Sequence, residues 1–192
     1  PSVSNIVDIY MLERSYDNLF RIWLQDGGAK PTPSTSDQLR INYSGKLNPL
    51  KSLSDQIVYH PVRYKILFGS SADEQLQATF KVVKNTSTNV TDAVIKTRVI
   101  AAINEFFALD NWDFGDAFYF TELAAYIHNQ LAPDLLTAVI VPNQSGQGFG
   151  SLFQIDSAAD EIFISGATVN DVSIITALGA NQLSASGTVI TS

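Results

Sequence analysis

The sequence predicts an α+β fold, and three features of its pattern indicate this class. Short apolar segments typical of strands lie before, between and after segments whose apolar residues recur at helical spacing. Their order is irregular, whereas a doubly wound parallel sheet requires a regular alternation of strand and helix. The chain has 192 residues and no cysteine, so its core forms without disulfides. We therefore expect a mixed sheet packed against helices.

The first two elements are predicted from the sequence before residue 29. In "NIVDIYMLER" (5–14) the apolar side chains begin by alternating, and we expect a largely buried strand. In "YDNLFRIWLQDGG" (16–28) apolar residues from Leu19 to Leu24 form a short helical stripe. Two consecutive glycines follow this stripe, so the helix ends at Gly27.

The next elements are predicted between residues 34 and 85. Ser34 to Asp37 offer side chains that can cap the free N–H groups of a helix, so a helix is expected from there. The segment "SDQIVYHPVRYKILFG" (54–69) is predicted to be extended, with a bend or a sheet edge at Pro61. A further short strand is expected in "LQATFKVVKN" (76–85).

Two helices are predicted in the second half of the chain. The first spans residues 91–109, starts with Thr91 as N-cap and carries a continuous apolar stripe. The second spans residues 121–131. We divide the chain into a first α+β module at residues 1–84 and a second at 85–192, with one continuous domain as the alternative.

The remaining segments are predicted to be strands and connections. "LLTAVIVPN" (135–143) is a strand, and two more strands are expected in "EIFISGATVNDVSIITAL" (161–178). Between them, "QSGQGFGS" (144–151) contains three glycines at the wrong spacing for a dinucleotide-binding loop, and no lysine of a Walker loop follows. This segment is therefore predicted to be a flexible connection.

Charge and hydropathy exclude two classes of partner. The formal net charge is −7, and the 12 Lys and Arg residues are scattered along the chain. Nucleic-acid binding normally requires a clustered basic surface, so we expect no nucleic-acid partner. No apolar run reaches the roughly 20 residues of a membrane-spanning helix, so no membrane partner is expected. The chain begins at Pro1, which suggests a piece of a longer protein.

The stretch "NWDFGDAFYFTELAAYIHNQL" (111–131) is a candidate acidic site. Its carboxylates could bind calcium, but neither a loop starting at Asp110 nor one at Asn111 places oxygen ligands and glycine as an EF-hand requires. Glu122 and His128 are six residues apart on the predicted helix, so they do not face one another. Carboxylates that stabilise a turn and a helix start explain the stretch better, and we expect no metal or cofactor.

The order of several motifs resembles the baseplate-J-like family, in particular the large wedge subunit of baseplates in T-even-type contractile-tailed phages. The matching segments span nearly the whole chain in order. They are "VDIYML" (7–12), "HPVRYKILFG" (60–69), "VIAAINEFF" (99–107), "FGDAFYFTELAAYIH" (114–128), "TAVIVPN" (137–143) and "DEIFISGATVNDVSII" (160–175).

This resemblance implies a structural protein of the virion and no enzymatic activity. It implies ferredoxin-like strand–helix packing, and a location in the tail baseplate after assembly in the host cytoplasm. The implied partners are other baseplate wedge proteins and further copies of the chain, as a homodimer within a larger ring around the tail hub. Because aromatic residues are enriched in interfaces, Tyr43, Tyr64 and Phe149 are candidate interface residues, with ordinary packing as the alternative.

Two other functions remain open at the level of sequence. One is a metal-dependent hydrolase that uses Asp113, Asp116, Glu122 and His128. The other is a receptor- or carbohydrate-binding module, which only the mixture of acidic and aromatic residues suggests.

Overall fold

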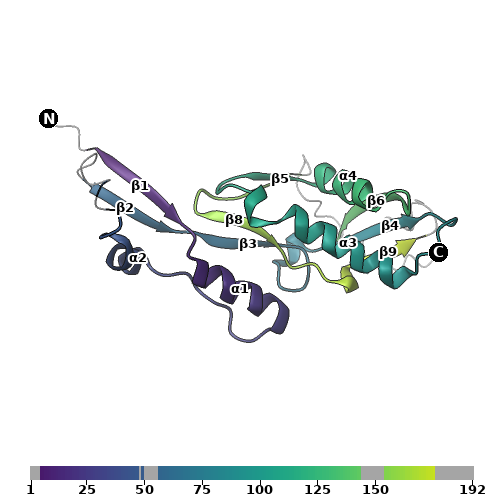
Figure 1. Ribbon diagram of the computed structural model, residues 1–192, viewed down its shortest axis with the longest axis horizontal. Helices are drawn as coiled ribbons and strands as arrows, with labels where there is room; N and C mark the ends of the chain where they lie inside the picture. Colours follow the sequence, from purple (N-terminus) through teal and green to yellow (C-terminus); the bar gives the residue numbers. More distant parts are fainter. Residues whose placement is uncertain (1–4, 48, 50–55, 144–153, 176–192) are drawn as a thin grey trace.

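The computed structural model of the chain describes residues 5–47, 49, 56–143 and 154–175. The molecule is elongated, with a ribbon of two strands projecting from one end of a larger body (Figure 1). The body contains two helices, α3 (Asp92–Phe106) and α4 (Phe120–Leu131), and most of the strands. The ribbon lies at the N-terminal end of the molecule.

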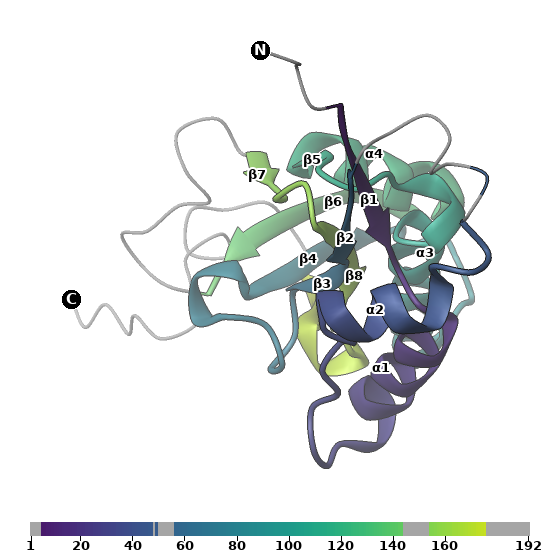
Figure 2. The same ribbon diagram turned by 90° about the vertical axis from the view of Figure 1, so that its left-hand side faces the viewer.

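The largest sheet of the described residues has three strands and is mixed. Its central strand, β4 (Ala78–Lys84), pairs antiparallel with β6 (Leu135–Pro142) and parallel with β9 (Val172–Ile175). The helices α3 and α4 contact each other and pack on the same face of this sheet (Figure 2). This arrangement confirms the predicted α+β class with a mixed sheet.

The main core lies between this sheet and the two helices. Alternate residues of β4 point into it, and Phe80 and Val82 are almost fully buried. A short strand, β5 (Ala117–Tyr119), pairs antiparallel with β7 (Gln154–Asp156) and contributes Phe118 to the core. The buried faces of α3 and α4 complete it with Ile95, Val99, Ala102, Ile103, Leu123, Ile127 and Leu131.

A second, smaller core lies between the helix α1 (Arg14–Asp26) and a parallel pair of strands. These strands are β3 (Arg63–Leu67) and β8 (Glu161–Ser165). The residues of the smaller core are Tyr16, Phe20, Val62, Tyr64, Ile66, Ala72, Ile162 and Ile164. Leu19, which belongs to the predicted apolar stripe of α1, is 56% exposed, so it lies outside the packed face of this helix.

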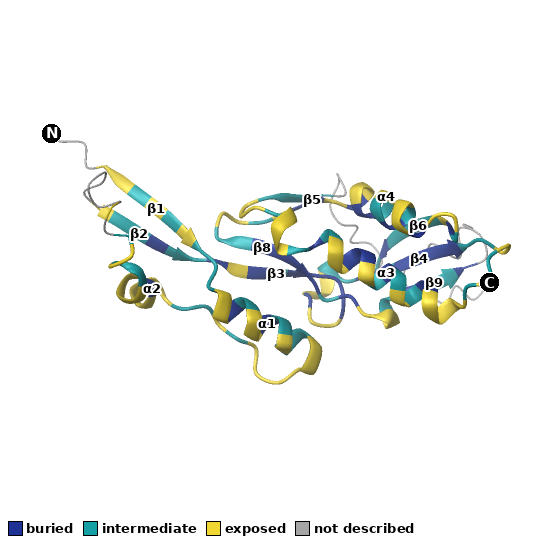
Figure 3. Ribbon diagram, viewed as in Figure 1, coloured by how far each residue is buried: buried dark blue, intermediate teal, exposed yellow. Residues whose placement is uncertain are grey.

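The projecting ribbon consists of β1 (Ile6–Met11) and β2 (Gln56–Pro61), which pair in parallel. The helix α2 (Ser36–Tyr43) packs against β2. Residues of β1 are alternately exposed and half-buried, as Figure 3 shows. The expectation of a largely buried strand was therefore wrong, because in the described part of the chain a helix covers one face of the ribbon and not the other.

Helix boundaries follow the predicted capping residues closely. Thr35 precedes α2, and its side chain forms a reciprocal capping box with Gln38. Thr91 precedes α3 and accepts the N–H of Val94. Short 3₁₀ turns occupy Glu74–Leu76, Leu109–Asn111 and Val169–Asp171. The first of the two predicted helices in the second half ends at Phe106 instead of residue 109.

Strands from the two expected modules share sheets. β3 and β4 lie before residue 85, and they pair with β8, β6 and β9, which lie after it. The ribbon and α2, in contrast, pair only within the first expected module among the described residues. The predicted flexible connection at residues 144–151 lies outside the described residues.

The ends of β3 and β8 are held in backbone contact. The N–H of Gly166 donates to the carbonyl of Leu67 at 2.9 Å. Phe68 and Gly69, which follow β3, both have positive φ values, of 65° and 73°. A Cβ atom at position 69 would lie 1.9 Å from the carbonyl oxygen of Gly166, so only glycine fits there.

We predict that Gly69→Ala lowers the free energy of unfolding by about 4 kcal/mol or more, since the backbone of Gly166 cannot move without breaking the β3–β8 contact. Gly115→Ala is the matched control. Gly115 also has a positive φ, of 80°, but its nearest neighbour would be 3.5 Å from the new Cβ, so we expect a loss of only about 1–2 kcal/mol. Urea denaturation measures both, and equal losses would contradict the steric argument.

The carboxylate of Asp134 joins three parts of the body. It accepts hydrogen bonds from the hydroxyl of Thr88 at 2.6 Å and from the guanidinium of Arg98 at 2.7 Å. Thr88 lies in the turn after β4, and Arg98 lies on α3. These hydrogen bonds, first that of Thr88 and then that of Arg98, lower the pKa of Asp134 below its ordinary value.

We predict that this contact stabilises the fold at neutral pH and is lost in acid. Because the pKa of Asp134 is lowered on folding, its contribution is present above the unfolded-state pKa of about 3.9 and disappears as pH falls through the folded-state value. Asp134→Asn should therefore be less stable than the wild type at pH 7 and approach it in strong acid. Urea denaturation at several pH values measures this difference.

The matched control for this pH dependence is Asp37→Asn. The Asp37 carboxylate is 83% exposed, and solvent screens its ion pair with Arg40. We expect a smaller loss of stability at pH 7 for this variant. A difference for Asp134→Asn that stays constant from pH 7 into strong acid would contradict the prediction.

Candidate functional site

The acidic stretch that the sequence singled out forms a turn. One carboxylate oxygen of Asp116 accepts the backbone N–H of Asp113 at 2.7 Å, and Gly115 supplies the positive φ between them. The backbone carbonyl of Asp116 accepts hydrogen bonds from both the N–H and the hydroxyl of Ser157. These contacts fix the entry into β5 and are those of a structural turn.

Two neighbouring hollows divide the residues of the possible hydrolase site. Asp116 and Glu122 line a shallow hollow of about 510 Å³ beside Trp112, whereas Asp113 lines a neighbouring hollow of about 250 Å³. His128 lines neither of these two hollows. Within the ranges that the structure describes, no three His, Asp or Glu residues lie close enough together to hold a metal ion.

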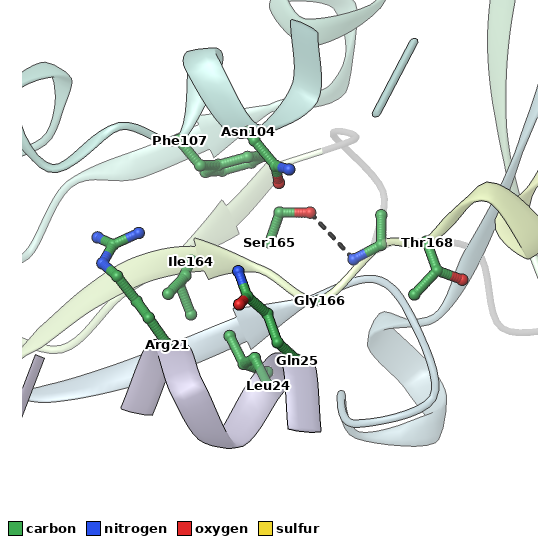
Figure 4. A pocket seen from close by; sticks show the side chains of 10 residues that line it. Arg21, Leu24, Gln25, Asn104, Phe107, Ile164, Ser165, Gly166 and Thr168 are labelled. Atoms are coloured by element: carbon green, nitrogen blue, oxygen red, sulfur yellow. Dashed lines mark hydrogen bonds between the residues drawn. The ribbon is translucent and has the colours of Figure 1, made fainter. Parts of the chain in front are cut away.

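Another hollow, of about 420 Å³, lies where β8 ends between α1 and α3 (Figure 4). Its polar side chains include Arg21, Gln25, Asn104 and Ser165. Two of these already have partners within the fold. Arg21 forms an ion pair with Asp17 at 2.7 Å, and the hydroxyl oxygen of Ser165 accepts the N–H of Ala167 at 3.1 Å. The hollow therefore offers hydrogen bonding but no activated nucleophile.

Of the three aromatic residues predicted to form interfaces, Tyr64 lies in the smaller core. It is 7% exposed, and its hydroxyl donates to the carboxylate of Asp17 and accepts from Arg21 at 3.4 Å. Burial, and then the hydrogen bond to Asp17, raises the pKa of Tyr64 above its ordinary value. Ordinary packing, the alternative offered by the sequence, accounts for this residue.

The other two candidates differ in position. Tyr43 lies half-buried at the end of α2, and its hydroxyl donates to the carboxylate of Glu13 at 3.3 Å. It therefore connects α2 to the chain at the start of α1. Phe149 lies outside the described residues.

The outer face of the ribbon is a surface that the sequence did not single out. In-register neighbours in a sheet project to the same face, so Tyr10 and His60 lie side by side on it, next to Asp8. The rings of Tyr10 and His60 stack at 4.7 Å, and a ring nitrogen of His60 lies 2.7 Å from the carboxylate of Asp8. Ile6, on the same face, is 51% exposed.

The opposite face of the ribbon is the covered one. Ile9 pairs with Tyr59 on this face. Tyr59 is 4% exposed, and Leu39 of α2 is fully buried. The alternation of residues 6 to 10 in the sequence placed Ile6, Asp8 and Tyr10 on one face, but no local signal shows which face α2 covers.

The edge of β1 is open in the structure. Among residues 5–47, 49, 56–143 and 154–175, β1 pairs with β2 alone. An unpaired strand edge presents a row of N–H and C=O groups that can pair with a further strand. Together with the outer face, this edge forms the candidate functional site, which we call the ribbon surface: Ile6, Asp8 and Tyr10 of β1 with Val58 and His60 of β2.

No protein-family model matches the chain, and a search of curated proteins finds no match. In the part of the chain that the structure describes, no helix combines the length and apolar character needed to cross a membrane. The functional conclusion therefore depends on the motifs of the sequence and on the geometry of the ribbon surface.

We predict that Asp116→Ala lowers the free energy of unfolding by about 1 kcal/mol, because the N–H of Asp113 loses its acceptor. Asp113→Ala is the matched control from the same turn. Its exposed side chain can be removed while its N–H keeps the bond to Asp116, so we expect a change within about 0.5 kcal/mol. Thermal or urea denaturation distinguishes the two, and a larger loss for Asp113→Ala would argue against a purely structural turn.

Proposed function

We propose that this protein is a structural virion protein, a baseplate wedge subunit of a contractile phage tail. It assembles by protein–protein contacts into the ring around the tail hub. The observation that supports this proposal most directly is the ribbon of β1, β2 and α2, which projects from the body (Figure 1). One of its faces and one of its edges are uncovered by any other described part of the chain.

The energetics of the ribbon favour a role in contact with other chains. A two-stranded sheet is marginally stable by itself in water and gains stability from a third strand or from packing against a helix. Among the helices that the structure describes, only α2 packs on the ribbon, and the residues of the ribbon are not members of either core. Such an element contributes little to folding of the body, so its value to the protein lies in binding a partner.

The character of the ribbon surface agrees with protein partners. It combines exposed apolar side chains, Ile6 and Tyr10, with a single hydrogen-bonded polar pair, Asp8 and His60. Aromatic and apolar groups form the centre of typical protein interfaces, and charged groups lie at the rim. In a closed ring the same surface recurs on every subunit.

The proposed partners are further copies of this chain and other baseplate wedge proteins. The motif order from "VDIYML" to "DEIFISGATVNDVSII" supports this choice, since the resemblance to the wedge subunit spans nearly the whole chain. The proposed location is the tail baseplate of the virion, after assembly in the host cytoplasm. Catalysis has no part in this proposal.

We predict that an antibody raised against the purified chain labels the baseplate end of contractile tails in electron micrographs of the phage that encodes it. Antibody pre-absorbed with the chain is the control. We also expect the average sedimentation coefficient, measured by sedimentation velocity, to rise with protein concentration, because subunits of a ring self-associate. A strict monomer at high concentration that binds no other wedge protein, together with unlabelled tails, would contradict the proposal.

A further inference from the structure

The free edge of β1 offers a specific way for two chains to join. We propose that β1 pairs antiparallel with β1 of a second copy, about a twofold axis that passes beside Ile9. The choice of a second copy as partner rests on the assembly role proposed above. The register of the pair follows from the backbone directions and charges of β1 itself.

The ribbon has two edges, and β1 is the more open of them. The helix α2 packs against β2. The last residue of β2 is Pro61, which has no N–H to donate to a neighbouring strand. β1 contains no proline, and within the described ranges its outer edge has no paired strand.

The backbone of β1 divides into groups directed at β2 and groups directed at the open edge. The carbonyl of Met11 accepts the N–H of Val62 at 2.8 Å, which places the backbone groups of residue 11 on the β2 side. In a strand, the backbone groups of alternate residues point to the same edge. The odd-numbered residues of β1 therefore bond to β2, and the even-numbered residues present their N–H and C=O groups to the open edge.

These directions restrict how a second β1 can pair. Hydrogen-bonded partners in an antiparallel pair must both present their groups to the shared edge. Each even-numbered residue of one β1 must therefore face an even-numbered residue of the second copy. Under a twofold axis this condition leaves two central registers, one with Asp8 opposite Asp8 of the second copy and one with Ile9 opposite Ile9 of the second copy.

Charge decides between the two registers. Like charges directly opposite each other on adjacent strands are destabilising, which disfavours the first register. In the second register Asp8 faces Tyr10 of the second copy, and the two strands exchange N–H···O=C bonds at that pair and at its symmetric equivalent. Asp8 is the only charged residue of β1, so no other like charges oppose this pairing.

The resulting sheet has four strands, β2–β1 from one chain and β1–β2 from the other. Because facing residues project to the same side, both α2 helices lie on one face. The outer faces join into one surface that combines Ile6 and Tyr10 with the polar pair of Asp8 and His60. A four-stranded sheet exceeds the size at which sheets become independently stable. The strand contact is small beside the roughly 800 Å² per partner of a standard interface, so we expect weak association of the isolated chain.

Disulfide trapping tests this register directly, because the chain contains no cysteine and a single introduced cysteine reports one contact. In the proposed register the Cα atoms of residue 9 in the two chains are about 4.5 Å apart, within the range of a disulfide. Ile9→Cys should therefore form a covalent dimer of the full chain under mild oxidation. Covalent dimer is measured on non-reducing gels at several protein concentrations.

Val7→Cys is the matched control for this cross-link, because residue 7 projects to the same face as residue 9 and the variant keeps Asp8. In the proposed register residue 7 faces residue 11, so the two Cα atoms of residue 7 would lie about 14 Å apart, beyond the roughly 7 Å limit for a disulfide. We expect at least several-fold less covalent dimer than with Ile9→Cys. Equal or greater cross-linking of Val7→Cys would overturn the proposed register, and no cross-link for either variant would overturn the edge pairing.

A second pair of variants tests the backbone contact without a cross-link. Asp8→Pro removes the N–H that would donate to the second copy, and an edge strand tolerates proline where that group faces outward. Asp8→Ala removes the same carboxylate, with its contact to His60, but keeps the N–H. We expect self-association of Asp8→Pro to be roughly tenfold weaker or more than that of Asp8→Ala, since two symmetric hydrogen bonds are lost.

Sedimentation equilibrium measures this association, and circular dichroism confirms that both variants fold. Equal association of the two variants would contradict pairing at this edge. The outcomes also separate this inference from the proposed function. If the chain self-associates or binds wedge proteins while Ile9→Cys gives no covalent dimer, the edge pairing is wrong and the assembly role stands. If the chain does not associate and the antibody raised against it does not label tails, both proposals are wrong.

Discussion

The packing of aromatic rings around Phe118 is the contact on which the rest of the body depends. Phe118 lies on β5. The centroid of its ring is 5.9 Å from that of Phe68, which follows β3, and 5.4 Å from that of Phe107, which follows α3. It is 4.9 Å from the centroid of Phe120 at the start of α4 and 6.3 Å from that of Phe163 on β8. Edge-to-face and tilted pairs of this kind add about 0.5–1.5 kcal/mol each beyond the burial of their area. One short strand thus holds both helices and the β3–β8 pair in place, and the positive φ of Phe68 is tolerated because its ring is fixed in this cluster.

The parts of the fold that could be predicted from the sequence are those set by neighbouring residues. Thr35 and Thr91 each precede a helix because a hydroxyl at that position caps the free N–H groups of the first turn, and this chemistry is local. The stripe on α3 was visible because helical spacing alone places Ile95, Val99 and Ile103 on one face. The turn at Asp113 to Asp116 was likewise recognised as structural, since its carboxylates failed the spacing of a calcium loop.

The parts that could not be predicted depend on residues that are distant in the sequence. Nothing in the sequence near β1 shows that α2 will cover one face of the ribbon and leave Ile6 and Tyr10 exposed, so the local pattern alone predicts a buried strand. The aromatic character of Tyr64 suggested an interface, but its exposure depends on α1, which packs over it and supplies Asp17. The ribbon surface was missed for the same reason: its openness is a property of the whole arrangement and of no single motif.

The parallel pairing of β3 with β8 has a consequence for synthesis of the chain. Arg63 pairs with Glu161, so β3 leaves the ribosome long before its partner strand exists. During that interval α1, which has already been made, can cover its buried side chains Tyr64 and Ile66. Contacts between residues so far apart are slow to form, and strands that wait for them are prone to aggregate. The smaller core, with α1 ahead of β3 in the sequence, therefore also protects the nascent chain.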